Sequence, residues 1–318
     1  MKNLNMFDAD KKKISKKFED STSLMKLPEE LRARAEKNGY LFFKHFFEPE
    51  KMLKLRREML QIVDKFGYLS PNANLIEGIA DINRINRVPI QQINENGNGV
   101  PLSLYKEVQK LQSFHAITHD PKLKDLFRML FEDEPFPHPR NIARIMLPHK
   151  DAKPTPSHQD FLHIQGTEHT WTCWAPLGDV PMSLGGLTVL EGSHKAGLLD
   201  VTTGHEGAGG LETILCNLGY EWAGTDYEIG DMLTFPSLTV HKSIPNKQRD
   251  RIRLSIDVRL QPISQPIEAR SLLPHGPFTW EELYEGWERE ELQYYWSNIS
   301  FDYIPWNEKI RWQKEKLC

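Results

Sequence analysis

Apolar residues recur every three or four positions through much of the first part of the chain, a period typical of amphipathic helices. The clearest case spans residues 49–66 and is followed by Gly67, a common helix terminator. Its apolar face is formed by Met52, Leu55, Met59, Ile62 and Val63. Weaker helical patterns cover residues 28–37, 104–115 and 122–131. Residues 40–47 are rich in aromatic side chains and are typical of a strand. Apart from this one strand, the pattern predicts a mainly helical N-terminal part over residues 27–139.

The pattern changes from about Arg140 onwards, where short apolar segments alternate with Pro, Gly and Asp. These segments have the length and composition of strands. They cover residues 141–147, 170–175, 187–190, 232–235 and 252–260. Short strands at this density predict a β-sandwich or barrel. We therefore expect a mainly β domain with flanking helices (α+β), whose β core spans about residues 140–263.

Three further segments complete the predicted organisation. Residues 1–26 are polar and Lys-rich, and we expect a mobile tail or a loosely docked arm ahead of one domain, residues 27–318. Residues 198–225 contain six glycines and predict a long loop, either a lid over a site or a surface insertion. The C-terminal part, residues 274–318, is expected to be helical, with a helix at 279–296 and its aromatic side chains packed on the sheet.

Composition and charge narrow the class of partner. Of the 318 residues, 39% are hydrophobic and 26% are charged, and the net charge is -4, so nothing indicates a nucleic-acid surface. No apolar run reaches the length of about 18 residues that a membrane-spanning helix requires. The N-terminus has no apolar segment of the kind found in secretory signals. We expect a cytoplasmic protein that acts on a small molecule, with its oligomeric state left open.

Three residues have the composition of a metal site. His158 and Asp160 are two positions apart, and on a strand such residues project from the same face. His241 stands at the end of a later apolar strand. Two imidazoles and one carboxylate make the facial triad of non-haem iron(II) oxygenases, which leaves three coordination positions open. We therefore predict His158, Asp160 and His241 as both the metal ligands and the catalytic centre.

The next apolar segment after His241 alternates strictly between apolar and polar residues, which predicts a strand with two unlike faces. Arg253 and Ser255 share its polar face. A guanidinium can bind the distal carboxylate of a 2-oxo diacid through two hydrogen bonds, and a hydroxyl can add one more. A surface strand with solvated charges, including Asp257 paired to an Arg, is the alternative interpretation.

The sequence that carries these residues resembles the phytanoyl-CoA dioxygenase family, which comprises iron and 2-oxoglutarate oxygenases. The similarity runs over residues 141–262 in five ordered blocks: SHQDF, WTCWAPLGDV, GGLTVLEGSHK, GDMLTFPSLTVHKSIPN and RIRLSIDVR. It implies a double-stranded β-helix (jelly-roll, cupin-like) core. It also implies Fe(II), 2-oxoglutarate and O2 as cofactors and co-substrates, with ascorbate as a candidate reductant. Trp174, Ser243 and Gln159 are placed near the co-substrate by the same resemblance.

The resemblance does not settle which arginine binds 2-oxoglutarate. The family usually has its 2-oxoglutarate arginine eleven residues after the last histidine, and that position here is Ile252. Alignment of the strand end favours Arg253, whereas a shift by one residue favours Arg251.

The implied reaction is hydroxylation of a C–H bond with decarboxylation of 2-oxoglutarate to succinate. The carboxylate Asp160 favours this outcome over halogenation, because halogenating relatives have a small residue there. Desaturation, cyclisation and epimerisation remain alternatives, as do a zinc hydrolase with the same ligands and a non-catalytic cupin-like binding protein.

Overall fold

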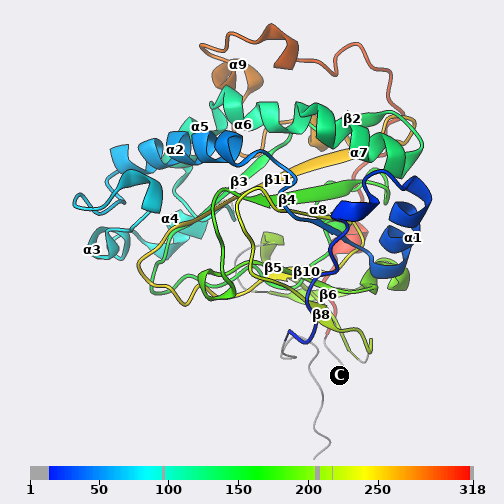
Figure 1. Ribbon diagram of the computed structural model, residues 1–318, viewed down its shortest axis with the longest axis horizontal. Helices are drawn as coiled ribbons and strands as arrows, with labels where there is room; N and C mark the ends of the chain where they lie inside the picture. The colour runs from blue at the N-terminus through cyan, green and yellow to red at the C-terminus, as the bar shows by residue number, and fades with distance from the viewer. Residues whose placement is uncertain (1–13, 95–96, 205–207, 217, 316–318) are drawn as a thin grey trace, which may run out of the picture.

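The large sheet of the protein lies between a layer of helices and a smaller sheet (Figure 1). This computed structural model describes residues 14–94, 97–204, 208–216 and 218–315. Side chains from both sheets, among them Trp174, Phe235 and Val189, are buried in one cluster, so the sheets enclose a common interior. The predicted jelly-roll core with flanking helices is confirmed.

The large sheet has the strand order β1-β9-β4-β11-β2, and β3 also pairs with β11. Its strands are β1 (Leu41–Phe43), β2 (Pro135–Pro137), β3 (Ile142–Met146), β4 (Trp171–Pro176), β9 (Met232–Pro236) and β11 (Arg253–Pro262). All of these pairings are antiparallel. The long strand β11 is therefore central, with β4 along one side and with β3 and then β2 along the other.

The small sheet has the order β10-β5-β8, and a separate pair joins β6 to β7. These strands are β5 (Leu187–Leu190), β6 (Val201–Thr203), β7 (Leu211–Thr213), β8 (Trp222–Ala223) and β10 (His241–Ser243). The expectation that residues 198–225 form one long loop is therefore wrong, because three short strands lie within them. Residues 205–207 and 217 fall outside the described residues, and the lid function stays a prediction.

Helices cover the outer face of the large sheet (Figure 1). The described helices with at least eight residues are α1 (Pro28–Asn38), α2 (Pro49–Lys65), α5 (Leu102–Gln109) and α7 (Pro121–Phe131). The shorter described helices of the chain are α3 (Ile82–Ile85), α4 (Ile90–Asn94), α6 (Gln112–Ala116), α8 (Phe161–Ile164) and α9 (Trp280–Leu283). The predicted helices of the N-terminal part are confirmed, except that residues 104–115 form two helices rather than one. No described helix is long and apolar enough to cross a membrane.

Strand β11 uses its two faces for different purposes. Its apolar side chains, such as Leu254 and Ile256, pack with the helices in the main hydrophobic core. The opposite side chains, such as Arg253 and Asp257, are also buried, and they line a cavity between the sheets. Every residue of β11 is buried, so the alternative of a solvated surface strand is wrong.

The C-terminal part differs from the predicted long helix. Among its described residues, 274–315, only α9 and two short 3-10 turns, Glu290–Leu292 and Glu308–Arg311, are helical. Gly286 has a φ of 79°, a left-handed conformation that cannot continue an α-helix. The aromatic residues instead pack with one another and with Phe136 of β2, in a cluster that includes Trp280 and Trp296.

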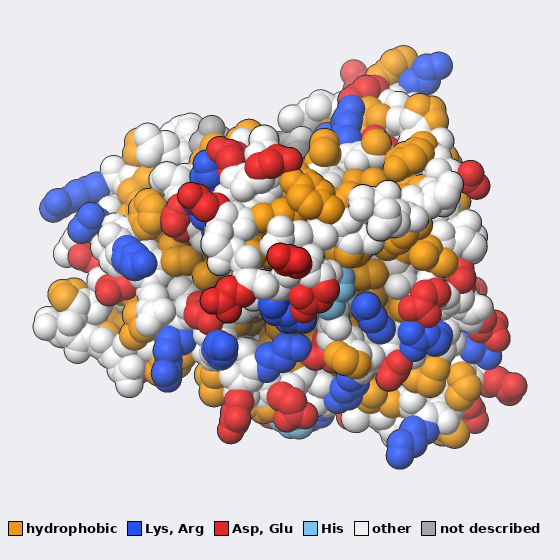
Figure 2. Space-filling model, turned by 90° about the horizontal axis from the view of Figure 1, so that it is seen from above, with side chains coloured by type: hydrophobic (Ala, Val, Ile, Leu, Met, Phe, Trp, Pro, Cys, Tyr) orange, Lys and Arg blue, Asp and Glu red, His pale blue; other side chains and the backbone are white. Residues whose placement is uncertain are grey.

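The described part of the N-terminal arm, residues 14–26, is docked on the domain, which was one of the two expected alternatives. Lys16 forms a β-bridge with Ala223, and Asp20 forms another with Phe42. Phe18 is buried between the two sheets. Residues 1–13 lie outside the described residues. On the face shown in Figure 2, acidic and basic side chains are interspersed, and neither sign covers the surface.

Candidate metal centre and co-substrate pocket

His158, Asp160 and His241 meet inside the space between the sheets. One ligand atom from each lies within 4.8 Å of the other two, and all three residues are buried. Both imidazole Nε2 atoms are 3.8 Å from Oδ1 of Asp160. This spacing leaves room for a metal ion among them, with bonds of the usual length of about 2.0–2.2 Å.

The backbone brings these residues together in a way that strand periodicity did not predict. His158 and His241 are paired by two backbone hydrogen bonds, each with an N···O distance of 3.0 Å. Asp160 is not on a strand, because its φ and ψ of -62° and -29° are helical and α8 begins at the next residue. The expectation that His158 and Asp160 share one face of a strand is therefore wrong, although their side chains do converge.

The two histidines are oriented by backbone carbonyl groups. The Nδ1–H of His158 donates to the carbonyl oxygen of Pro156 at 2.8 Å, and that of His241 donates to Thr239 at 3.0 Å. Burial lowers the pKa of both imidazoles, which favours their neutral forms. A neutral imidazole that donates from Nδ1 has its lone pair on Nε2, and both Nε2 atoms face Asp160.

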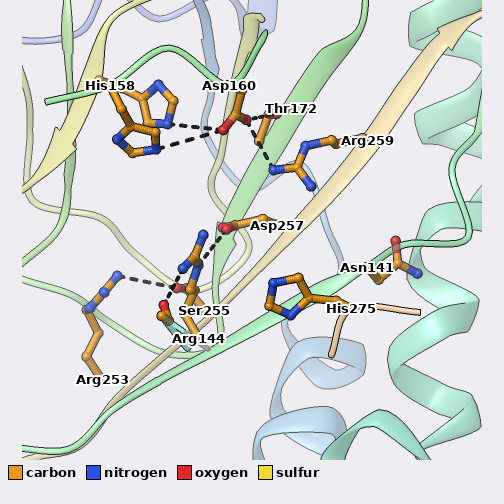
Figure 3. Close-up of polar contacts among 12 residues, drawn as sticks. Asn141, Arg144, His158, Asp160, Thr172, Arg253, Ser255, Asp257, Arg259 and His275 are labelled. Carbon is orange, nitrogen blue, oxygen red and sulfur yellow. Dashed lines mark hydrogen bonds and ion pairs between the residues drawn. The ribbon is translucent and has the colours of Figure 1, made fainter. Parts of the chain in front are cut away.

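Asp160 is held by two residues that the sequence reasoning missed. Oδ2 accepts hydrogen bonds from Oγ1 of Thr172 at 2.5 Å and from Nη2 of Arg259 at 3.3 Å (Figure 3). Burial alone would raise the pKa of Asp160, but Arg259, the histidines and Thr172 hold it well below its ordinary value. Thr172 on β4 and Arg259 on β11 are direct cross-strand partners. Arg259 belongs to the alternating polar positions of β11, and this alternation was the signal in the sequence that could have identified it.

The triad opens onto a cavity whose walls also include Trp174, Ser243 and Arg253. Arg253 is 4% exposed, and among the described residues it has no ion-pair partner. Its Nη1 donates a hydrogen bond to Oγ of Ser255 at 3.3 Å. Burial lowers the pKa of Arg253 to about 10. A buried guanidinium without a carboxylate is costly to keep charged, unless a ligand supplies the missing anion.

The other buried charges of this region are paired. Arg144 donates from Nε to Oδ2 of Asp257 at 2.8 Å, and Arg259 forms an ion pair with Asp160 (Figure 3). Arg144 and Asp257 therefore form a structural ion pair. Once these pairs are set aside, Arg253 is the arginine of the cavity wall whose charge is not balanced by a described carboxylate.

The remaining predicted co-substrate residues do not all reach the cavity. Arg251 precedes β11 and lines a different cavity, with Arg56 and Asp179. Gln159 is turned towards backbone groups: Nε2 donates to the carbonyl oxygens of Gly197 and Leu238, and Oε1 accepts from the N–H of Leu199. Ser255 is fully buried beneath Arg253 rather than on the cavity wall.

The donor set fits a divalent transition metal. Two neutral imidazole nitrogens and one ionised carboxylate oxygen are aimed at a common point, and the cavity borders them on the open side. The second ring nitrogen of each histidine and the second oxygen of Asp160 are already hydrogen-bonded. Such outer contacts are typical of metal ligands whose orientation is fixed before the ion binds.

Comparison with known proteins places this geometry in a family context. A model of the phytanoyl-CoA dioxygenase (PhyH) family matches residues 35–254. The curated protein 1-deoxypentalenic acid 11-beta-hydroxylase of Streptomyces arenae is 24% identical over 275 residues, which cover 81% of this chain and 89% of that protein. The protein of the same name from Streptomyces exfoliatus is 34% identical over 136 residues, which cover 38% of this chain and 45% of that protein.

Among solved structures, the epimerase SnoN in complex with Fe3+, alpha ketoglutarate and nogalamycin RO has the same fold. It aligns with a TM-score of 0.53 at 17% identity and covers 76% of this chain and 85% of SnoN. The family match includes all three residues of the triad and Arg253, and it ends before Asp257 and Arg259.

Proposed function

This chain belongs to the phytanoyl-CoA dioxygenase family, and from that premise we propose that it is an Fe(II)- and 2-oxoglutarate-dependent dioxygenase that hydroxylates a C–H bond of a small-molecule metabolite. One observation carries the proposal. A two-histidine, one-carboxylate cluster and an unbalanced buried arginine share the wall of a single cavity. An iron site and a site for the distal carboxylate of a 2-oxo diacid require these features together.

Each residue has a defined task in this proposal. His158, Asp160 and His241 hold the iron, while Thr172 and Arg259 fix the carboxylate of Asp160. When bound, the iron supplies the chemistry by which 2-oxoglutarate and O2 become succinate and carbon dioxide while one oxygen atom enters the substrate C–H bond. The triad residues are buried, which limits the access of water to the reaction.

Arg253 binds the distal carboxylate of 2-oxoglutarate, with Ser243 and Trp174 on the same wall. Its position in the triad cavity, and that of Arg251 outside it, favour Arg253 for this role. Ser255 supports Arg253 from beneath. Gln159 has a structural task in this proposal, because backbone groups already occupy its polar atoms.

Hydroxylation is the outcome that we propose among those open to this chemistry. The Streptomyces relatives are hydroxylases by name, and Asp160 retains the carboxylate ligand that halogenating enzymes lack. SnoN is an epimerase by name, so epimerisation remains the alternative, together with desaturation and cyclisation. Product analysis by mass distinguishes hydroxylation, which adds one oxygen atom, from these three.

Release of succinate from 2-oxoglutarate, stimulated by members of a metabolite collection, tests the proposal. The protein is supplied with Fe(II), ascorbate and O2, and its iron content is measured in parallel. We expect about one iron per chain, and we expect neither iron binding nor succinate from His158→Ala, Asp160→Ala or His241→Ala. Zinc-dependent hydrolysis without succinate would instead support a hydrolase, and ligand binding without turnover would support a binding protein.

A further inference from the structure

A second cavity adjoins the triad cavity at two residues that the proposed function places beside the distal carboxylate of 2-oxoglutarate. The two cavities share Arg253 and Ser243 as wall residues. At its other end the second cavity is lined by Lys150, Lys153 and Arg249, which are exposed. The outer cleft, as we call this second cavity, therefore leads from the surface of the protein to the buried guanidinium of Arg253.

The inner end of the outer cleft is fixed by the backbone that carries the metal ligands. The N–H of Ser243 donates to the carbonyl oxygen of Thr155 at 3.2 Å, and both residues line the triad cavity. The two metal-binding histidines pair with each other further along these same segments. Two walls of the outer cleft, within residues 147–154 and 244–249, continue the same segments in the opposite direction. The outer cleft and the metal site are thus built on shared stretches of chain.

The segment before the metal ligands is also tied to the third wall, which contains helix α3 and the residue after it. Oδ1 of Asn86 accepts a hydrogen bond from the N–H of Lys150 at 2.9 Å. Nε2 of His149 donates to the carbonyl oxygen of Val88 at 3.1 Å, and Nδ1 accepts from the N–H of Asp151 at 3.1 Å. These contacts hold the backbone of the wall in place and leave the lysine side chains free to meet a ligand.

The described wall of the outer cleft carries basic side chains and no acidic one. Lys150, Lys153 and Arg249 form no ion pair with any described residue. Their acidic neighbours in the sequence, Asp151 and Asp250, are exposed and do not belong to the described wall. A concave surface lined by charges of one sign raises the local concentration and the association rate of ligands of the opposite sign. The outer cleft should therefore attract a dianion more strongly than a monoanion or a neutral molecule.

A third cavity also borders Arg253, but its charge fits this role less well. Its wall contains Glu77 and Asp179 as well as Arg56 and Arg251. Apart from Arg253 itself, two acidic side chains thus accompany two arginines. Among the described wall residues, Arg253 is the only one that this third cavity shares with the triad cavity, whereas the outer cleft shares two.

We propose that the outer cleft is the passage by which 2-oxoglutarate enters the triad cavity and succinate leaves it. Both molecules are dicarboxylates, which the basic entrance attracts. The 2-oxo acid end of 2-oxoglutarate passes Arg253 first, and Arg253 then holds the distal carboxylate, the end nearer to the entrance. The inference rests on the proposed function for the identity of the co-substrate, but the route is tested by rates of binding without turnover.

A bulkier side chain in the outer cleft tests the route. Ala152 is a half-buried wall residue, and Ala152→Phe places a ring in the passage. An obstacle on a route raises the barriers to entry and exit equally. The association and dissociation rates of 2-oxoglutarate should therefore both fall by the same factor, at least about tenfold, while Kd stays unchanged. Stopped-flow fluorescence of the Fe(II)-loaded protein without O2 measures both rates, because the ring of Trp174 is 5.9 Å from the guanidinium of Arg253.

Ala33→Phe is the matched control, because Ala33 is exposed on α1, at the opposite end of the molecule from α3 (Figure 1). It should leave both rates unchanged. If both rates are also unchanged in Ala152→Phe, or if its Kd rises through faster dissociation alone, the passage lies elsewhere and the proposal is overturned.

Removal of the charges tests the entrance without changing the width of the cleft. The triple variant Lys150→Gln/Lys153→Gln/Arg249→Gln should slow association of 2-oxoglutarate by about tenfold at low ionic strength. It should also remove most of the dependence of this rate on salt. Its control, Lys26→Gln/Lys37→Gln/Lys195→Gln, changes the net charge equally through exposed lysines at or near α1.

Equal association rates in the two triple variants would overturn the proposal, since only the total charge would then matter. Failure of the proposed function would look different. In that case 2-oxoglutarate would not bind to the unaltered Fe(II)-loaded protein at all, whatever the state of the outer cleft.

Discussion

At the scale of single residues, the described charged side chains between the sheets are matched in pairs, with one exception. Arg144 is paired with Asp257, and Arg259 with Asp160. Arg253 contacts the hydroxyl of Ser255 and the ring of Trp174, but it has no carboxylate partner among the described residues. An unbalanced buried charge weakens a protein on its own, because its hydration is lost without compensation. A bound anionic ligand would therefore supply the countercharge that Arg253 lacks.

Replacing Arg253 should consequently impair co-substrate binding more than folding. We expect Arg253→Ala to weaken 2-oxoglutarate binding by about 2–5 kcal/mol, the usual cost of removing one partner of a buried charge pair. Titration of the metal-loaded protein with 2-oxoglutarate measures the change. Arg251→Ala is the control, because Arg251 lines another cavity; a larger effect from Arg251→Ala would transfer the role to that residue.

Thr172 gives a second prediction at this scale. Thr172→Val keeps the shape of the side chain but removes the hydroxyl that donates to Asp160. Loss of such a contact to a metal ligand typically lowers metal affinity by about 10- to 100-fold, which competition with a chelator would measure. Thr170→Val serves as the comparison, since the Thr170 hydroxyl is buried without a partner. Equal iron affinity in both variants would show that the Thr172 contact is unimportant.

At the scale of elements, the end of α1 depends on a close contact with the segment after β5. Gly39 caps α1 in a left-handed conformation with a φ of 69°. A Cβ at Gly39 would lie only 2.2 Å from Nδ1 of His194, whose Nε2 donates to the carbonyl oxygen of Glu36. The glycine is therefore required both by its backbone angles and by the neighbouring ring.

Gly39→Ala should destabilise the protein more than the backbone strain alone explains. Left-handed strain costs an alanine about 1–2 kcal/mol, and displacement of the His194 ring adds to that. Gly286→Ala isolates the strain, because Gly286 also has a positive φ but no atom within 4 Å of the position of a Cβ. Urea unfolding of both variants provides the comparison. Equal losses of stability would mean that the ring moves aside without cost.

The elements predicted correctly from the sequence are those in which the apolar residues follow a clear pattern. Apolar spacing located α1, α2 and α7, and short apolar runs located β4, β5 and β9, because each element buries apolar side chains in one or both of the two main hydrophobic clusters. Residues 279–296 were predicted as one helix, but they contain only the short helix α9 and the 3-10 turn Glu290–Leu292. Their aromatic side chains are satisfied by packing against β2 and one another, and period alone does not reveal that partner.

The site was predictable in its residue types and less so in its geometry. His158, Asp160 and His241 were identified because the chemistry of iron restricts its ligands. The helical backbone at Asp160 was missed, since spacing of two residues does not specify a strand. Thr172 and Arg259 were missed because they contact Asp160 only through the register between β4 and β11, which is a tertiary feature.

At the scale of the whole molecule, the two faces of the large sheet have different functions. The helices and the apolar side of β11 form the main core, and the polar side of β11 faces the triad cavity. Ile256, for example, is fully buried in the helix-facing core, whereas Asp257 next to it lines the cavity. A substitution on β11 should therefore affect either stability or chemistry according to whether its position is even or odd.

The central place of β11 also bears on how a newly made chain folds. Ribosomes deliver β4 and the helices of the N-terminal part before β11, yet β11 lies between β4 and both β3 and β2. Until it emerges, the helices lack a partner for part of their apolar surface, and the edges of β3 and β4 stay unpaired. Nascent chains in this interval should rely on chaperones, because such surfaces and edges promote aggregation. A chain stopped after Ile252 should therefore collect in the insoluble fraction of cells, and its recovery as a folded monomer would mean that the helical layer is stable before the barrel closes.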